Sequence, residues 1–316
     1  MDDMLVKDIL NNIEKVIMGK RNEITQLLKG IIAGGHILIE DVPGVGKTTL
    51  VKALCKSLNL SYSRIQFTPD LLPSDITGVS IYNPKNGVFE FKKGPIFSNI
   101  VLADEINRTS PKTQSALLEV MEEYQVSEGV NTYLLKKPFI VLATQNPVEY
   151  EGTFNLPEAQ LDRFMMKIRI GYADKATESE ILQKYREIEP LSQIESVASE
   201  TDIIMLQEKV KTIKASKAIT DYIVNITDNT RNNKYISLGA STRGSLCLLR
   251  IAQASALVSG RNYVTPDDVK NNAVAVLSHR IKISSAGRAN GLNSESVIGD
   301  IVERVDIPRA VQYGEF

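Results

Sequence analysis

Apolar residues follow two different patterns along this chain, and the change between them predicts two structural parts. In the first part, short apolar runs alternate with stretches whose apolar residues recur three and four positions apart, as in strands and helices. The runs IVLA and FIVLAT are continuous, which is typical of strands buried on both faces. Strands interleaved with helices predict an α/β fold, a parallel sheet with helices on both sides. The predicted strands are His36–Glu40, Tyr62–Phe67, Ile100–Ala103, Phe139–Thr144 and Met165–Ile170, and the helices among them are Met4–Val16, Ile24–Ala33 and Thr48–Leu58.

The second part shows helical spacing only. Thr265-Pro-Asp-Asp is a strong helix start, because it combines an N-cap, a proline at the first helical position and two acids at the positive end of the helix dipole. We therefore expect an α/β domain at residues 1–173 and an all-helical domain at 174–316. The helices predicted for the second domain are Lys175–Ile188, Thr201–Val210, Lys217–Thr230, Ser241–Val258 and Pro266–Leu277.

The composition excludes several classes of protein. Hydrophobic residues make up 43% of the 316 residues and the net charge is −1, so general disorder is excluded and a strongly basic nucleic-acid binder is not favoured. No apolar run reaches the roughly 18 residues of a membrane span, and the acidic start does not resemble a leader peptide. Two cysteines and two histidines are too few for a metal centre of those residues. We expect a cytoplasmic protein.

The segment Ile37–Thr49, ILIEDVPGVGKTT, has the order of a phosphate-binding P-loop: strand, glycine turn, Lys-Thr and helix. Gly44 and Gly46 let the backbone curl so that its N–H groups face phosphate oxygens, and Lys47 reaches the β and γ phosphates. The Thr48 hydroxyl is a candidate Mg²⁺ ligand. ATP and Mg²⁺ are therefore the expected ligands.

One position departs from the common P-loop pattern, which has glycine where Asp41 stands. Aspartate tolerates a left-handed backbone better than most residues, so the turn can survive this exchange. The expected nucleotide-binding residues are Asp41, Val42, Pro43, Gly44, Val45, Gly46, Lys47, Thr48 and Thr49.

Two further strands end in polar residues that suit nucleotide hydrolysis. Asp104 and Glu105 follow IVLA, where a bend at the strand end allows both to face one site. Asp104 is the candidate for the Mg²⁺ hydration shell, and Glu105 for orienting and deprotonating the attacking water. Asn146 ends the run FIVLATQNP and is placed to bond the γ-phosphate and the water. The alternatives are a solvated loop acid for the pair and a simple Asn-Pro turn for Asn146.

With these three elements in order, the chain resembles the AAA+ ATPases, and within them the MoxR family. The resemblance covers nearly the whole chain and includes RIQFTPDLLPSDITG, GPIFSNIVLADEINRTSPKTQSALLEVMEE, ATQNPVEYEGTFNLPEAQLDRF and GASTRG. It implies an AAA+ core with a C-terminal helical lid, and ATP bound between the two. It also implies that two inserts, at about 77–93 and 126–137, form β-hairpins.

The resemblance also implies roles for residues that spacing alone does not assign. Asn146 matches sensor 1, and Arg163 matches the arginine finger that reaches the γ-phosphate of the neighbouring subunit. Arg243 matches sensor 2, from the lid of the same chain. A structural ion pair is the alternative for Arg163, and a solvated side chain for Arg243. Arg108 either contacts the neighbour too or is a surface arginine.

The function implied is that of a ring-forming ATPase, hexameric in this family, which acts as a chaperone. Such proteins remodel or mature partner proteins or insert metal into them, and the partners often carry a von Willebrand factor A domain. The inserts are the expected partner contacts. Two alternatives remain open at this stage: a nucleic-acid motor of related ring architecture, which the near-neutral charge disfavours, and a nucleotide switch that does not hydrolyse ATP.

Overall fold

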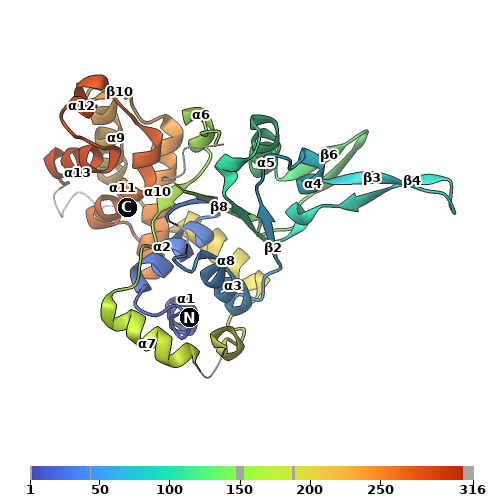
Figure 1. Cartoon of the computed structure of the whole chain (residues 1–316). Coiled ribbons are helices and arrows are strands. Elements are labelled where there is room, and N and C mark those ends of the chain that lie inside the picture. Colours follow the sequence, from blue (N-terminus) through green and yellow to red (C-terminus); the bar gives the residue numbers. More distant parts are fainter. Residues whose placement is uncertain (1, 43, 147–152, 187–188, 309–316) are drawn as a thin grey trace.

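A five-stranded parallel sheet forms the centre of the molecule (Figure 1). The computed structural model describes residues 2–42, 44–146, 153–186 and 189–308. The strand order is β2-β5-β8-β1-β9, so one buried strand, β8, separates β1 from β5. This confirms the predicted parallel α/β sheet. The strands are β1 (Ile37–Glu40), β2 (Tyr62–Gln66), β5 (Ile100–Asp104), β8 (Ile140–Gln145) and β9 (Met166–Ile168).

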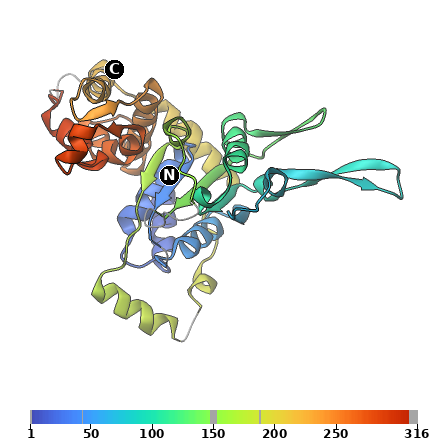
Figure 2. The ribbon, with the colours of Figure 1, turned by 45° about the horizontal axis from the view of Figure 1, so that its top comes forward.

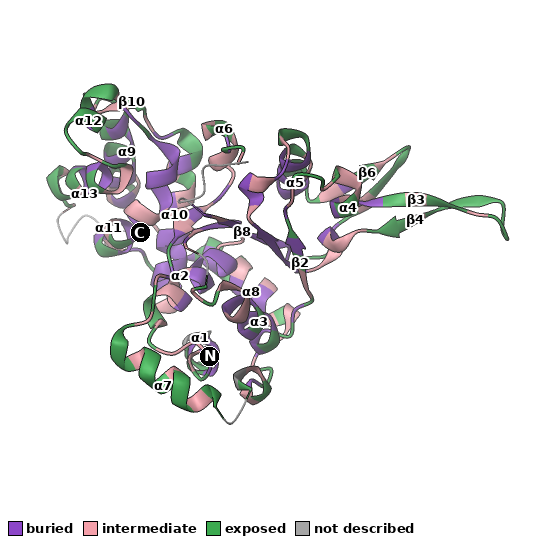
Figure 3. Cartoon of the chain, viewed as in Figure 1, coloured by how far each residue is buried: buried purple, intermediate pink, exposed green. Residues whose placement is uncertain are grey.

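Alternate residues of the central strands enter two separate hydrophobic cores, one on each face of the sheet. In β5, Ile100 and Leu102 join one core, and Val101 and Ala103 join the other. All four side chains are fully buried. The continuous apolar runs in the sequence therefore reflect burial on both faces, as predicted. Figure 3 shows the same strands as the buried centre of the fold.

Helices from both ends of the chain cover the first face of the sheet. Helices α1 and α3 pack together, and α2 packs against α8 and α10 (Thr242–Val258). The second face is covered by α4 and α5, whose apolar residues complete the second core. The helices of these two layers are α1 (Asp2–Glu14), α2 (Arg21–Ile32), α3 (Lys47–Ser57), α4 (Pro73–Thr77), α5 (Pro111–Glu123) and α8 (Glu200–Thr212), with 3₁₀ turns η1 (Pro95–Phe97) and η2 (Ile106–Arg108).

His36 shows how β1 is fixed within these layers. Its Nδ1 accepts a hydrogen bond from the Val141 amide (3.0 Å), and its Nε2 donates to the Met121 carbonyl (2.9 Å). The ring also stacks beside Tyr124. Burial lowers the pKa of His36 to about 4, so the ring is neutral near pH 7. His36 therefore satisfies two buried backbone groups, one on β8 and one at the end of α5.

Two antiparallel hairpins project from the side of the sheet that lies away from the lid (Figures 1 and 2). Strands β3 (Gly78–Asn83) and β4 (Val88–Lys93) make the longer hairpin, and β6 (Gln125–Glu128) and β7 (Asn131–Leu134) make the shorter one. Each occupies a segment where an insert hairpin was expected. The longer hairpin is exposed along most of its length (Figure 3).

The C-terminal lid packs against the edge strand β9 and the short helix α6 (Glu158–Leu161). It contains one feature that periodicity missed, an antiparallel pair formed by β10 (Ile236–Leu238) and β11 (Lys282–Ile283). Segments this short show no detectable alternation. The lid helices are α9 (Lys217–Arg231), α10 (Thr242–Val258), α11 (Pro266–Leu277), α12 (Ser285–Ala289) and α13 (Ser294–Arg304), with the 3₁₀ turn η4 (Ser278–Arg280).

The segment that leaves the sheet does not join this lid directly. Helix α7 (Lys175–Tyr185) runs past the N-terminal segment, where Lys184 Nζ donates to the Lys15 carbonyl (2.5 Å). After η3 (Pro190–Gln193), the amides of Val197 and Ala198 donate to the Ser57 carbonyl at the end of α3. Residues 175–186 and 189–198 therefore lie along the core. Within the described ranges, none of the helices combines the length and apolar character needed to cross a bilayer.

Candidate nucleotide site

The P-loop turn has the backbone conformation that its glycines predict. Gly44 and Gly46 have φ angles of +86° and +83°, in the left-handed region that favours glycine. Lys47 begins α3 immediately after this turn, and its Nζ donates to the main-chain carbonyl of Asp41 (3.1 Å). The lysine and the helix N-terminus therefore lie at the same turn. Pro43, part of the expected cradle, is outside the described residues.

Asp41 acts through its side chain, which corrects the reason given for its presence in the turn. It is not among the described non-glycine residues with positive φ, so tolerance of a left-handed backbone does not explain it. Its Oδ2 accepts hydrogen bonds from the amides of Ile170 and Gly171, both at 2.7 Å, and its Oδ1 accepts from the Val42 amide (2.9 Å). The carboxylate thus ties the P-loop to the chain that leaves β9, a role glycine cannot perform.

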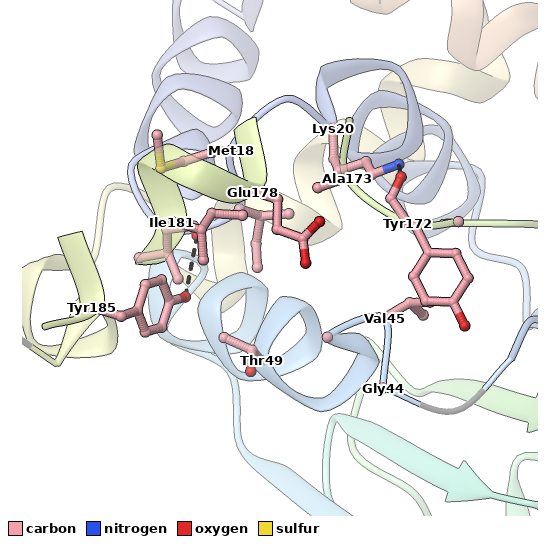
Figure 4. A pocket seen from close by; sticks show the side chains of 14 residues that line it. Met18, Lys20, Gly44, Val45, Thr49, Tyr172, Ala173, Glu178, Ile181 and Tyr185 are labelled. Carbon is pink, nitrogen blue, oxygen red and sulfur yellow. Dashed lines mark hydrogen bonds between the residues drawn. The ribbon is translucent and has the colours of Figure 1, made fainter. Parts of the chain in front are cut away.

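A cavity of about 300 Å³ opens beside the P-loop (Figure 4). Its walls come from the N-terminal segment 16–20, the P-loop and the first turn of α3, the segment 171–173, and α7. Helix α7 contributes Glu178, Ile181 and Tyr185, and the Tyr185 hydroxyl contacts the Val16 carbonyl (3.5 Å). Helices α9–α13 contribute none of the described lining residues. Of the expected lid segment 174–316, only α7 therefore borders the cavity.

The carboxyl ends of β5 and β8 bring Asp104 beside Thr144. The Thr144 hydroxyl donates to Asp104 Oδ1 (2.6 Å), and strand register pairs Thr144 with Ile39, just before the P-loop. The other carboxylate oxygen, Oδ2, accepts from Arg64 Nη2 (2.6 Å) and Nε (3.1 Å) on β2. The candidate Mg²⁺ carboxylate is therefore buried and already paired with a cation.

Glu105 reaches the same edge through a backbone bend. Its φ of +58° is left-handed, and its amide donates to the Thr144 hydroxyl (2.8 Å). This bend is how two consecutive acids avoid opposite faces of the sheet. The side chain is held by Gln66 Nε2 (2.8 Å) and Arg108 Nη1 (3.2 Å), both donating to Oε2. Arg108, considered above for contact with a neighbour, pairs with Glu105 of its own chain.

Asn146 follows β8 and is buried. The preceding residue, Gln145, pairs with Glu40, and its carbonyl accepts from the Asp41 amide (3.1 Å). Asn146 therefore directly follows the residue that bonds Asp41 at the start of the P-loop. This is the end of the sheet where sensor 1 was expected. Residues 147–152, which include the proline of the Asn-Pro motif, lie outside the described residues.

The two candidate arginines meet on a different surface. Arg163 Nη2 lies 3.0 Å from Oε2 of Glu122 on α5, and Arg243 Nη1 lies 3.3 Å from Oε1 of the same carboxylate. Neither arginine lines the P-loop cavity. The structure thus joins Arg243, from the lid, to the predicted arginine finger and not to the P-loop of its own chain.

Sequence reasoning missed Arg64 and Gln66 as parts of the site. Both are on β2, and positions two apart on a strand share a face. Register pairs Gln66 with Asp104, so this face lies beside both acids. The pattern that could have identified them is this polar pair at the end of a strand next to the one that carries Asp104.

The oxygen donors present suit Mg²⁺ held together with a nucleotide. No group of three histidine, cysteine or acidic side chains able to hold a metal occurs in the described ranges. Mg²⁺ is commonly held by one or two protein oxygens together with substrate phosphates, and the Thr48 hydroxyl and the Asp104 carboxylate supply such oxygens. Arg64 is half exposed, which leaves it room to move away from Asp104.

Comparison with known proteins identifies the family. A family model described as "ATPase family associated with various cellular activities (AAA)" matches residues 36–166, and a model for the AAA lid domain matches residues 228–301. A crystal structure of a Cytophaga hutchinsonii protein superposes with a TM-score of 0.91 at 44% identity, and covers 98% of this chain and 96% of that one.

Three curated relatives match over most of their own length. YeaC of Bacillus subtilis is 49% identical, with 96% of this chain and 95% of that protein covered. The chaperone MoxR1 of Mycobacterium tuberculosis is 40% identical, with 94% and 81% covered. The protein MoxR of Paracoccus denitrificans is 30% identical, with 86% of each covered. This chain therefore belongs to the MoxR family of AAA+ ATPases.

Proposed function

We propose that this protein is an Mg²⁺-dependent ATPase that works as a homo-oligomeric ring, a hexamer by family resemblance, and acts as a chaperone on other proteins. The observation that carries the proposal is the separation of the site into two halves. One half lies at the P-loop and the sheet edge, and the other is the pair Arg163 and Arg243, which lies outside the P-loop cavity. Two copies are then needed to bring both halves to one ATP.

The first half binds the nucleotide and positions the water. The turn amides and Lys47 hold the phosphates, while Thr48 and Asp104 hold Mg²⁺, which neutralises phosphate charge when bound. Glu105 orients and deprotonates the water, and Asn146 bonds the γ-phosphate and the water. The Gln66 and Arg108 donors both bond Oε2 of Glu105, and they hold this carboxylate at the sheet edge.

The second half is completed by the neighbour. Arginine supplied in trans stabilises charge on the transferred phosphoryl group and is worth roughly 10³–10⁵ in rate. In the single chain both arginines form ion pairs with Glu122. These groups are partly exposed, so the ion pairs are weak enough to be exchanged for a phosphate. Turnover should therefore depend on assembly.

The test is phosphate release measured over a range of protein concentrations. Turnover per subunit should rise with concentration, and Glu105→Gln should abolish turnover while ATP still binds. Arg163→Ala should also bind ATP without turnover. No phosphate release at any concentration would instead support a nucleotide switch that does not hydrolyse ATP.

The hairpins are the proposed contacts for a protein partner. Phe89 at the far end of the longer hairpin is 73% exposed, and Val130 on the shorter one is fully exposed. Contiguous exposed apolar patches mark sites of interaction with other proteins. The near-zero net charge supports a protein partner over nucleic acid.

A pull-down would identify the partner. Glu105→Gln held in ATP should stall with its partner bound, and the added Phe89→Ser change should reduce capture without loss of assembly. Family resemblance makes proteins with a von Willebrand factor A domain, and proteins that require maturation or metal insertion, the first partners to test. Tight binding to nucleic acid that weakens steeply with salt would contradict a protein-directed role.

A further inference from the structure

Asp162, the residue before Arg163, is held by the lid through both of its carboxylate oxygens. Arg280 Nε donates to Oδ1 (2.9 Å), and the Ser241 hydroxyl donates to Oδ2 (3.0 Å). Asp162 follows α6 on the core, Ser241 precedes α10, and Arg280 ends η4. One short segment of the core is thus joined to two separate elements of the lid.

Arg280 also donates hydrogen bonds to the backbone of the two residues that follow Arg163. Its Nη1 donates to the Met165 carbonyl (3.1 Å), and its Nη2 donates to the Phe164 carbonyl (2.5 Å). His279 lies 3.0 Å from the same Phe164 carbonyl through its Nε2. The Arg280 side chain is fully buried. Bonds to residues before and after Arg163 restrict where that arginine can project.

The hydrogen bond between Ser241 and Asp162 also fixes the position of the second arginine, Arg243. Ser241 is the N-cap of α10, where its hydroxyl oxygen accepts from the Gly244 amide (3.3 Å), and Arg243 lies in the first turn of that helix. A shift of α10 relative to Asp162 would therefore move Arg243 relative to Arg163. In the structure the two arginines are close enough to share the Glu122 carboxylate.

We propose that Asp162, Ser241 and Arg280, here called the Asp162 clasp, are positioning residues that lock the lid to the arginine-bearing segment. Arg163 and Arg243 then enter the neighbouring subunit's site together, as one rigid unit. This inference rests on the proposed function, because it requires the arginines to act in trans. Small misplacements of a catalytic group cost about 10²-fold in rate, so loosening the clasp lowers kcat in the neighbour.

Ser241→Asp and Ser241→Asn form a matched pair of variants. Both aspartate and asparagine cap helices well, so α10 should keep its start in each. The asparagine amide can still donate to Asp162, whereas an aspartate removes the donor and places a second carboxylate against it. We expect Ser241→Asp to lower kcat by about 10-fold or more, with the KM for ATP and assembly unchanged. Ser241→Asn should stay within about twofold of wild type.

Mixed rings separate positioning in trans from damage to the subunit's own site. Lys47→Ala subunits lose their own ATP site and keep an intact arginine surface. When Lys47→Ala subunits are added to Ser241→Asp subunits, turnover per Ser241→Asp subunit should rise. The comparison is with wild-type subunits mixed with Lys47→Ala subunits in the same ratio. Adding the double variant Lys47→Ala with Arg163→Ala should give no such rise.

Three outcomes would overturn the proposal: normal turnover by Ser241→Asp, loss of its assembly, or absence of rescue by Lys47→Ala subunits. Each of these can be distinguished from failure of the proposed function. If that function is wrong, wild-type turnover will not depend on concentration, or Arg163→Ala will remain active.

Discussion

Arg163 and Arg243 lie 80 positions apart in the sequence, yet they contact the two different oxygens of one carboxylate, that of Glu122. Arg163 belongs to the core and Arg243 to the lid, and their distances to Glu122 are 3.0 and 3.3 Å. The relationship puts the two predicted phosphate-contacting arginines on one surface. It also means that each must leave Glu122 to reach a phosphate.

 The first prediction concerns that shared carboxylate. Glu122→Gln should release both arginines and lower the protein concentration at which ATPase activity is half-maximal. Because these are partly exposed ion pairs, the free energy of unfolding should change by less than about 1 kcal/mol. Glu119→Gln, the same charge change one turn earlier on α5, is the matched control and should leave the concentration dependence as in wild type. An unchanged dependence in Glu122→Gln would mean that the carboxylate does not compete with the neighbour's phosphates.

A second prediction concerns Arg64, which donates to the carboxylate oxygen of Asp104 at 2.6 Å. Arg64→Gln removes a cation that competes for this oxygen, so half-maximal activity should need less Mg²⁺. Arg64→Lys keeps the charge and should behave more like wild type. Titration of ATPase activity with Mg²⁺ measures the effect. A higher Mg²⁺ requirement in Arg64→Gln would show that Arg64 supports the metal site and does not compete with it.

A third prediction separates two explanations of Asp41. If its side chain ties the P-loop to Ile170 and Gly171, Asp41→Gly should weaken ATP binding although it restores the glycine of the common pattern. Leaving these amides without an acceptor should also cost about 1–3 kcal/mol of unfolding free energy. Denaturant unfolding and nucleotide titration measure the two effects. Wild-type stability and affinity in Asp41→Gly would favour the backbone explanation instead.

The contrast at Asp41 shows where sequence reasoning succeeds and where it stops. The strands β1, β5 and β8 were predicted because burial on both faces leaves a local record, a continuous apolar run. Gly44, Gly46 and Lys47 were likewise found from local turn chemistry. The bonds of Asp41 Oδ2 reach residues about 130 positions away, and nothing local to Asp41 records them.

Contacts between residues far apart in the sequence also explain why the shared partner of Arg163 and Arg243 was not predicted. The roles of Arg163 and Arg243 came from family resemblance, and their partner Glu122 depends on how the lid packs against α6 and α5. The contacts of Asp162 with Ser241 and Arg280 join the lid to α6 at this place. Arg64 was overlooked for a related reason, because its pairing with Asp104 follows from the β2–β5 register.

A fourth prediction is a pH dependence of folding stability that depends on His36. Its pKa is about 4 in the folded chain and near 6.5 when unfolded, so the unfolded state binds the proton first as pH falls. The stability that neutral His36 contributes is complete above about pH 6.5 and is lost as the pH falls towards 4, by about 3 kcal/mol. Denaturant unfolding of wild type and His36→Gln across this range should give a shallower pH slope for the variant. Equal slopes would show that the pKa of His36 does not differ between the folded and unfolded states.

The claim that two subunits build each ATP site is tested most directly by mixing two inactive variants. Lys47→Ala lacks the phosphate half of the site, and Arg163→Ala lacks the arginine half, so each alone should release almost no phosphate. In mixed rings an intact P-loop can meet an intact arginine, and an equal mixture should regain activity at roughly a quarter of the sites. Recovery of turnover on mixing is the predicted result, and a mixture that stays inactive at every ratio, although it assembles, would contradict a shared site.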